Sequence, residues 1–110
     1  MLEEKIRESV IRKLRMLEWF VKIMHMNMFT SGFPDLFCAH YKYGIRLVEI
    51  KQPRVEDSSF TPAQLENFPK MEAAGVGIWI LVSDSDQEYA KLFKAPNWRQ
   101  YQMMKMLSGR

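Results

Sequence analysis

The first apolar positions of the chain recur at helical spacing. Ile6, Val10, Leu14 and Leu17 are three or four residues apart, and charged residues fill most of the positions between them. This spacing places the apolar side chains on one face of a helix. Acidic residues in the first turn also suit the positive end of the helix dipole. The pattern therefore predicts an amphipathic helix over residues 2–17.

After this helix the periodicity is compatible with either a longer helix or a strand. Residues 20–23 are aromatic and β-branched apart from one lysine, which favours a strand over about residues 19–26. Two further apolar segments, 36–39 and 45–50, flank a short polar stretch that contains a glycine. Two apolar runs separated in this way predict a hairpin-like pair of strands.

The second half of the chain opens with three helix-start signals. Thr61 is a suitable cap, Pro62 occupies the first helical position, and Gln64 follows the cap by three residues. These residues predict a helix that begins at Pro62 with a capping box and ends near Gly75. Pro69 lies inside this helix, where a proline lacks the backbone N–H that the helix needs. We therefore expect a kink or a break at Pro69.

Residues 76–82 are an apolar run that predicts a buried strand. A strand, a crossover helix and a second strand form a parallel, right-handed unit, so the predicted order is α-β-β-β-α-β around a mixed sheet. Residues 83–86 read Ser-Asp-Ser-Asp, which we interpret as the cap of another helix, with an acidic metal site as the alternative. An extra C-terminal helix is expected after residue 96. Its apolar stripe would cover the core or pair with a second subunit, and it consists of Trp98, Tyr101, Met104 and Leu107.

Length and composition indicate a single domain that spans residues 1–110. No run of eighteen uncharged apolar residues is present, and the N-terminus lacks the apolar segment of a secretory signal, so we expect no membrane contact. A single cysteine, Cys38, excludes an internal disulfide and fits a reducing compartment. We therefore expect a cytoplasmic location, in the host cell if a phage encodes the chain. The net charge of +3 permits a polyanionic partner without requiring one.

Candidate chemistry lies at the two predicted hairpin strands. Glu49 and Lys51 are two residues apart, so in a strand they share a face and Ile50 points the opposite way. Pairing of the two segments would place Asp35 across from that end, so we expect two carboxylates and one ammonium group to converge at an exposed edge of the sheet. Carboxylate oxygens suit a hard cation such as magnesium, and magnesium beside a lysine suits phosphodiester hydrolysis. The alternative is that these charges are only the solvated face of an edge strand.

Three motifs occur in a fixed order along the chain: Gly-x-Pro-Asp ending at Asp35, Glu-x-Lys at 49–51, and a glutamine at Gln64. In this order they resemble the signatures of the VRR-NUC group within the PD-(D/E)XK nucleases. The resemblance covers about residues 3–84. It implies a restriction-endonuclease-like α/β fold with the α-β-β-β-α-β core. It also implies a DNA phosphodiesterase that uses Mg²⁺, with Mn²⁺ as a substitute.

The resemblance also implies roles for residues of the hairpin. Asp35 and Glu49 would bind one or two magnesium ions together with the backbone carbonyl of Ile50. Lys51 would orient the attacking water or balance charge on the phosphate oxygens. Because two carboxylates are its neighbours, the charged form of Lys51 is favoured.

The remaining implied site residues lie on helices and in a loop. In the family a glutamate of the first helix reaches the metal, and Glu3 is the best match, while Glu4 and Glu8 stay open as alternatives. Acidic residues there also have a sufficient explanation in the helix dipole. Gln64 would hydrogen-bond the water or a phosphate in addition to its part in the capping box. Arg54 follows the second motif closely enough to contact a phosphate, and a solvated loop arginine is the alternative.

The substrate class also follows from the resemblance. Compact stand-alone VRR-NUC proteins resemble Holliday-junction resolvases, so we expect a structure-selective endonuclease that acts on branched DNA in repair or recombination. A flap or nicking endonuclease, a catalytically silent DNA-binding module and a protein-interaction module are the alternatives. A four-way junction is two-fold symmetric, and paired cuts are supplied directly by a homodimer. The many methionine and aromatic residues fit such a subunit interface.

Overall fold

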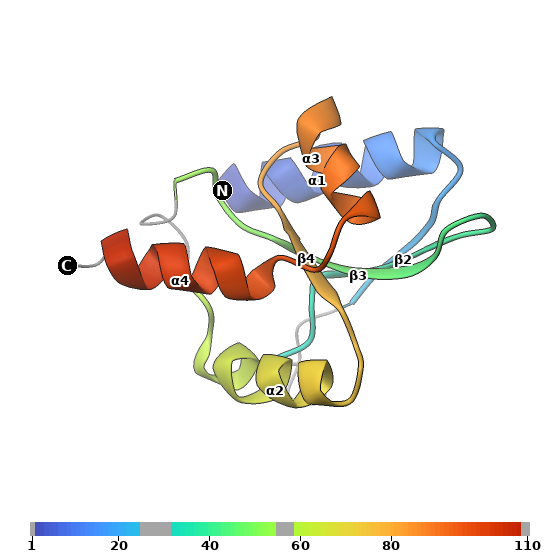
Figure 1. Cartoon of the computed structure of the whole chain (residues 1–110). Helices are drawn as coiled ribbons and strands as arrows, with labels where there is room; N and C mark the ends of the chain where they lie inside the picture. The colour runs from blue at the N-terminus through green and yellow to red at the C-terminus, as the bar shows by residue number, and fades with distance from the viewer. Residues whose placement is uncertain (1, 25–31, 55–58, 109–110) are drawn as a thin grey trace.

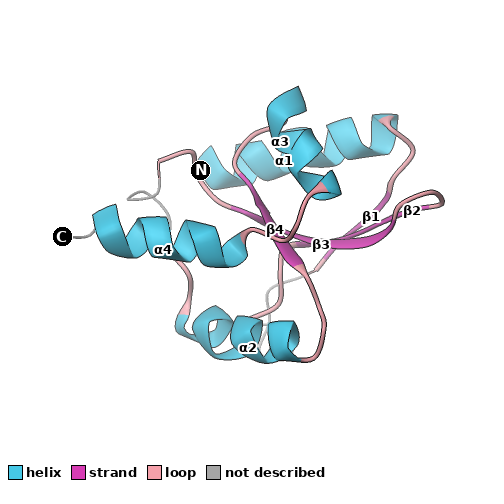
Figure 2. Cartoon of the chain, viewed as in Figure 1, coloured by secondary structure: helices cyan, strands magenta, loops and turns pink. Residues whose placement is uncertain are grey.

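The structure, a computed structural model, describes residues 2–24, 32–54 and 59–108. Figure 1 shows helices on both sides of a small sheet, and Figure 2 separates the helices from the strands by colour. Along the chain the elements are α1 (Leu2–Met16), β1 (Phe20–Ile23), β2 (Leu36–His40), β3 (Gly44–Ile50), α2 (Pro62–Ala73), β4 (Ile78–Leu81), α3 (Asp86–Ala90), the 3₁₀ helix η2 (Lys91–Phe93) and α4 (Trp98–Ser108).

The sheet has the order β1-β2-β3-β4. β1 pairs with β2 and β2 with β3 in antiparallel orientation, whereas β3 and β4 are parallel. In the β2–β3 hairpin Leu36 pairs with Val48 and His40 with Gly44. The mixed sheet and the order α-β-β-β-α-β match the fold predicted from the sequence. β1 ends at Ile23, short of the predicted range, whose last residues, 25–26, lie outside the described residues.

Successive side chains of each strand point to opposite faces of the sheet, so the core has two layers, one on each face. One face packs against α1, which contributes Val10, Ile11 and Leu14 to a cluster with buried residues of the sheet. Odd and even residues of a strand point to opposite faces, so Ile78 and Ile80 of β4 belong to the second cluster. There they meet α2 and α4 in a group of mostly aromatic side chains: Phe60, Phe68, Trp98 and Tyr101.

A kink or a break was expected at Pro69, and the break does not occur, because the helix α2 continues through Pro69 to Ala73. Proline removes one N–H donor from the helix, but the neighbouring Phe68 is fully buried and packs edge-to-face against Phe60 and Trp98. Packing of an apolar face supplies most of the stability of a helix in a protein. The anchored Phe68 therefore holds the helix together across the missing hydrogen bond.

In the C-terminal half, the length of β4 differs from expectation, and the role of the stripe on α4 had been left open. β4 is shorter than the run 76–82, and only part of the stripe on α4 reaches the core. Trp98 and Tyr101 are buried, whereas Met104 and Leu107 are exposed.

The predicted cap of α3 is present, because the Ser85 side chain accepts a hydrogen bond from the backbone N–H of Glu88. Among the described residues, no helix is both long enough and apolar enough to span a membrane.

Candidate metal centre

The loop that leads into β2 lies directly against α2. Gly32 has a φ of +87°, a backbone conformation that side chains disfavour. A Cβ atom at this position would also lie 2.8 Å from the carbonyl oxygen of Ala63 in α2. Only glycine satisfies both constraints, and Pro34, which is buried, follows two residues later. The ring of Pro34 fixes the φ of Pro34 itself and leaves φ of Asp35 free. The close contact of Gly32 with α2 and the rigid Pro34 together hold the loop in place just before Asp35.

Asp35 and Glu49 face each other across the start of the hairpin and are locked by backbone donors. The Asp35 N–H donates to Glu49 Oε1 at 3.1 Å, and the Ile50 N–H donates to Asp35 Oδ2 at 2.8 Å. This arrangement follows from the register, because Leu36 pairs with Val48 and the preceding residue therefore lies opposite Glu49. Each carboxylate is thus oriented by the strand that carries the other.

A lysine and a glutamine complete the surroundings of Glu49. Glu49 Oε2 accepts a hydrogen bond from Gln64 Nε2 at 2.9 Å and lies 3.3 Å from Lys51 Nζ. Lys51 Nζ also donates to the carbonyl oxygen of Ser59 at 2.7 Å and lies 4.8 Å from the centre of the Phe60 ring. Gln64 keeps its capping role as well, because its Oε1 accepts from the Thr61 N–H. One side chain therefore joins the start of α2 to Glu49.

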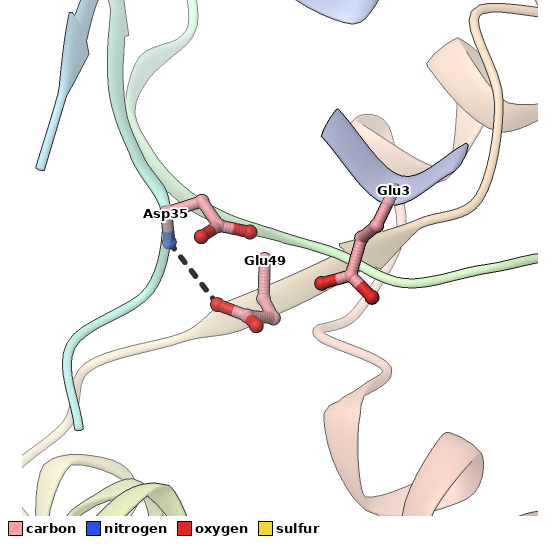
Figure 3. A group of neighbouring side chains, drawn as sticks. All are labelled: Glu3, Asp35 and Glu49. Atoms are coloured by element: carbon pink, nitrogen blue, oxygen red, sulfur yellow. Dashed lines mark hydrogen bonds between the residues drawn. The ribbon is translucent and has the colours of Figure 1, made fainter. Parts of the chain in front are cut away.

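The first turn of α1 brings a third carboxylate to the same place. Oxygen atoms of Glu3, Asp35 and Glu49 all lie within 4.8 Å of one another. Figure 3 shows the three side chains converging from α1, from the start of β2 and from β3. Glu4 and Glu8, the alternatives on α1, are exposed and lie outside this group. The structure thus selects Glu3 among the three glutamates of the first helix.

Burial makes this cluster electrostatically unfavourable when it is fully ionised. Burial, and then the charge of Asp35, raise the pKa of Glu49 from 4.5 to about 8, and Lys51 and Gln64 offset only part of that rise. Burial also raises the pKa of Asp35, against the lowering effects of the Ile50 N–H and of Arg7. Desolvation and a nearby like charge both disfavour an ionised carboxylate. If all three carboxylates were ionised, the cluster would therefore carry more negative charge than Lys51 and Arg7 neutralise.

These properties fit a hard divalent cation. Mg²⁺ takes oxygen ligands and is usually bound through a small number of carboxylates. Three converging carboxylates, two of them buried, supply such oxygens. The carbonyl group of Ile50 belongs to the same stretch of β3, and the backbone N–H of Ile50 already orients Asp35. The residues present are therefore compatible with the magnesium site that the sequence predicts.

Comparison with known proteins decides the identity of the fold. No family model and no curated protein matches the chain. A solved structure described as a VRR_NUC domain superposes with a TM-score of 0.66 at 20% sequence identity, and the match covers 84% of this chain and 96% of that chain. The chain has the VRR-NUC fold. At this identity the likeness shows the fold, and it confirms the restriction-endonuclease-like α/β architecture predicted from the motifs.

Within this VRR-NUC fold, the predicted site residues come together. Four of them are in contact with one another in space, and Glu3 approaches them from α1; the four are Asp35, Glu49, Lys51 and Gln64. One expectation was wrong: the two hairpin carboxylates were placed at an exposed sheet edge, but Asp35 is 8% and Glu49 2% exposed. β3 is an inner strand of the sheet, and residues of α1 and α2 lie against the two carboxylates: Glu3, Arg7 and Gln64. Arg54 is exposed, and its predicted phosphate contact stays a prediction.

One residue of this site, Arg7, was not predicted from the sequence. Its Nη1 lies 3.9 Å from Asp35 Oδ1. Arg7 follows Glu3 by four residues, and residues four apart lie on the same face of a helix. That spacing is the signal that could have placed Arg7 beside the carboxylates once Glu3 was assigned.

Proposed function

We propose that the protein is a divalent-metal-dependent endonuclease that hydrolyses phosphodiester bonds in DNA. The observation that carries the proposal is the burial of Asp35, Glu49 and Lys51 together at one end of the sheet of a VRR-NUC fold. Solvated charges on an edge strand would be exposed, so that explanation of the Glu-x-Lys motif fails. Buried acids with raised pKa values and a specific charge partner are typical of functional sites.

Glu3, Asp35, Glu49 and the backbone carbonyl of Ile50 are the groups that would hold Mg²⁺, with Mn²⁺ as a substitute. A bound divalent cation would supply an activated water at neutral pH and positive charge opposite the phosphate oxygens. Carboxylates bind metal in their deprotonated form. Glu49, whose pKa is about 8 in the metal-free protein, therefore gives up a proton when the site is loaded.

Lys51 is the residue that we assign to the charge that develops during hydrolysis. A fixed ammonium group in a site that excludes water interacts with a developing anion more strongly than it would in water. The Ser59 carbonyl and the Phe60 ring keep Lys51 in place, so little reorganisation is needed. Gln64 holds the carboxylate of Glu49 through its Nε2. Its second amide proton is the one that can reach a water or a phosphate.

Branched DNA, first of all a four-way junction, is the substrate class that we propose, and a homodimer is the proposed assembly. Backbone hydrolysis requires no base contacts, so selectivity would come from the shape of the substrate. A two-fold dimer would present two active sites to a two-fold symmetric junction. The end of α4 supports a partner surface, because it leaves an exposed apolar group in the described part of the chain: Met103, Met104, Met106 and Leu107.

The test is a cleavage panel. Purified protein is incubated with labelled junction, flap, duplex and single-stranded DNA, with and without Mg²⁺, and light scattering at micromolar concentration gives the oligomeric state. We expect Mg²⁺-dependent cleavage with paired cuts in the junction and a dimeric mass. A protein that cleaves none of the four substrates with Mg²⁺ or Mn²⁺ would overturn the nuclease proposal. A monomer that makes only single cuts would instead be a structure-specific nickase.

A further inference from the structure

Arg7 is placed at the carboxylate cluster with most of its hydrogen-bonding capacity unused. Its guanidinium lies 3.9 Å from Asp35 Oδ1, which is beyond hydrogen-bond distance, and its side chain is 29% exposed. A guanidinium group carries five N–H donors. Across residues 2–24, 32–54 and 59–108, this ion pair is the single polar contact recorded for it.

Other arginines of the chain differ in this respect. Arg46 donates to the carbonyl oxygens of Tyr43, Ile45 and Leu92. Arg12, which lies further along α1, donates to Ser9 Oγ at 3.2 Å. The half-buried Arg7 therefore stands out, because its donors are available beside a cluster of acidic groups.

The position of Arg7 also conflicts with a purely metal-binding role for the site. A guanidinium next to Asp35 repels a divalent cation that approaches the same carboxylate. The conflict is removed when an anion enters together with the metal and pairs with the guanidinium in place of Asp35. A phosphodiester matches this need, because the planar fork of arginine binds two phosphate oxygens at once.

We propose that Arg7 binds the non-bridging oxygens of the scissile phosphate and exchanges its long contact with Asp35 for this one when DNA binds. The inference rests on the proposed nuclease function. Glu3 and Arg7 would then act as a pair from one face of α1, with the carboxylate directed to the metal and the guanidinium to the substrate. A guanidinium that only neutralised Asp35 would explain the ion pair but not the unused donors.

The test compares three variants: Arg7→Ala, Arg7→Lys and the matched control Arg12→Ala, which removes the same charge from an exposed position of the same helix. Thermal unfolding checks that each variant is folded. Single-turnover cleavage at saturating protein measures the rate of the chemical step in Mg²⁺. DNA affinity is measured in Ca²⁺, and calorimetry without DNA measures Mg²⁺ affinity.

We expect Arg7→Ala to slow single-turnover cleavage by about a hundredfold, the usual effect of removing one preorganised transition-state donor. Arg7→Lys should recover only part of the rate, since an ammonium lacks the planar fork. Arg12→Ala should stay near the wild-type rate. Without DNA, the Mg²⁺ affinity of Arg7→Ala should be unchanged or higher, because a repelling charge has been removed.

Three results would overturn the inference. The first is equal cleavage rates for Arg7→Ala and Arg12→Ala. The second is weaker DNA binding of Arg7→Ala with an unchanged saturated rate, which would place the contact at another phosphate. The third is a loss of Mg²⁺ affinity, which would make Arg7 a positioning residue for Asp35. If the wild-type protein cleaves no DNA, the proposed function fails and no phosphate is scissile. The Ca²⁺ affinities then test only the contact between Arg7 and a DNA phosphate: equal values for Arg7→Ala and Arg12→Ala refute this contact, and a weaker value for Arg7→Ala supports it.

Discussion

Glu49 is the residue through which the site responds to pH. Burial and the charge of Asp35 raise its pKa from 4.5 to about 8 in the folded protein. Between these values the folded protein keeps a proton that the unfolded chain releases. The unfolded state then binds fewer protons than the folded state, so the free energy of unfolding falls as the pH rises. The metal-free protein is therefore most stable, as far as Glu49 is concerned, at the acidic end of this range.

The first prediction concerns this pH dependence. Thermal unfolding in the presence of a chelator should show a decreasing midpoint between pH 5 and pH 8. Glu49→Gln should flatten the decrease, because the amide does not titrate. The exposed Glu66, which pairs with Lys70 on α2, provides the matched control Glu66→Gln. If Glu49→Gln and Glu66→Gln followed the wild-type curve equally, Glu49 would not carry the raised pKa.

Lys51 separates metal binding from hydrolysis. Lys51→Met keeps a similar volume but removes the ammonium group, so we expect the single-turnover rate to fall by about a hundredfold or more. Mg²⁺ affinity should change much less, because an ammonium group is no metal ligand. Lys70→Met removes an exposed lysine of α2 and serves as the control. Lost Mg²⁺ affinity with a wild-type rate would reverse the roles assigned to Lys51 and the carboxylates.

At the scale of elements, the start of α2 links helix stability to the site. The capping box joins Thr61 and Gln64, and Gln64 also donates to Glu49. Thr61→Ala should lower the free energy of unfolding by about 1 kcal/mol. It should also weaken Mg²⁺ binding, because the turn that carries Gln64 loses its anchor.

The cap of α3 provides the control for this prediction. Ser85→Ala removes a cap that accepts from the Glu88 N–H, and Ser85 belongs to a different helix. Urea unfolding gives the free energy of unfolding of both variants, and calorimetry gives their Mg²⁺ affinity. Thr61→Ala and Ser85→Ala should destabilise to a similar extent, and only Thr61→Ala should alter Mg²⁺ binding. An unchanged Mg²⁺ affinity of Thr61→Ala would show that the cap and the site are independent.

The elements that the sequence predicts well are those fixed by local rules. The β2–β3 hairpin and the start of α2 follow from apolar alternation and from the cap at Thr61. The uninterrupted α2 was harder to foresee, because the packing of Phe68 against other elements offsets the effect of Pro69. The sequence also left open whether the stripe on α4 covers the core, and in the structure Trp98 and Tyr101 are buried whereas Met104 and Leu107 are exposed.

The same distinction applies to the site. Asp35, Glu49 and Lys51 could be placed together because strand alternation and hairpin pairing are regular. Their burial could not be inferred, because α1 and α2 cover the site by contacts between distant parts of the chain. Arg7 resembled any charged residue on the surface of an amphipathic helix. Its spacing of four residues from Glu3 was the signal in the sequence, and the approach of α1 to the start of β2 brings it to Asp35.

At the scale of the whole molecule, the VRR-NUC fold is present at 20% identity to a solved VRR_NUC domain. A fold tolerates such divergence when apolar patterning and turn chemistry are kept. Function depends on the particular residues of the site rather than on the fold. The proposed nuclease activity therefore depends on the acidic cluster, and the substitution of one carboxylate in that cluster tests it.

The decisive measurement is Mg²⁺-dependent cleavage of labelled branched DNA by Asp35→Asn. The control is Asp86→Asn, at an exposed aspartate that pairs with Lys13 and lies outside the acidic cluster. We predict that the wild-type protein and Asp86→Asn cleave with Mg²⁺, and that Asp35→Asn remains folded, binds DNA and does not cleave. Cleavage by folded Asp35→Asn at a rate near that of the wild-type protein would contradict the proposed metal centre.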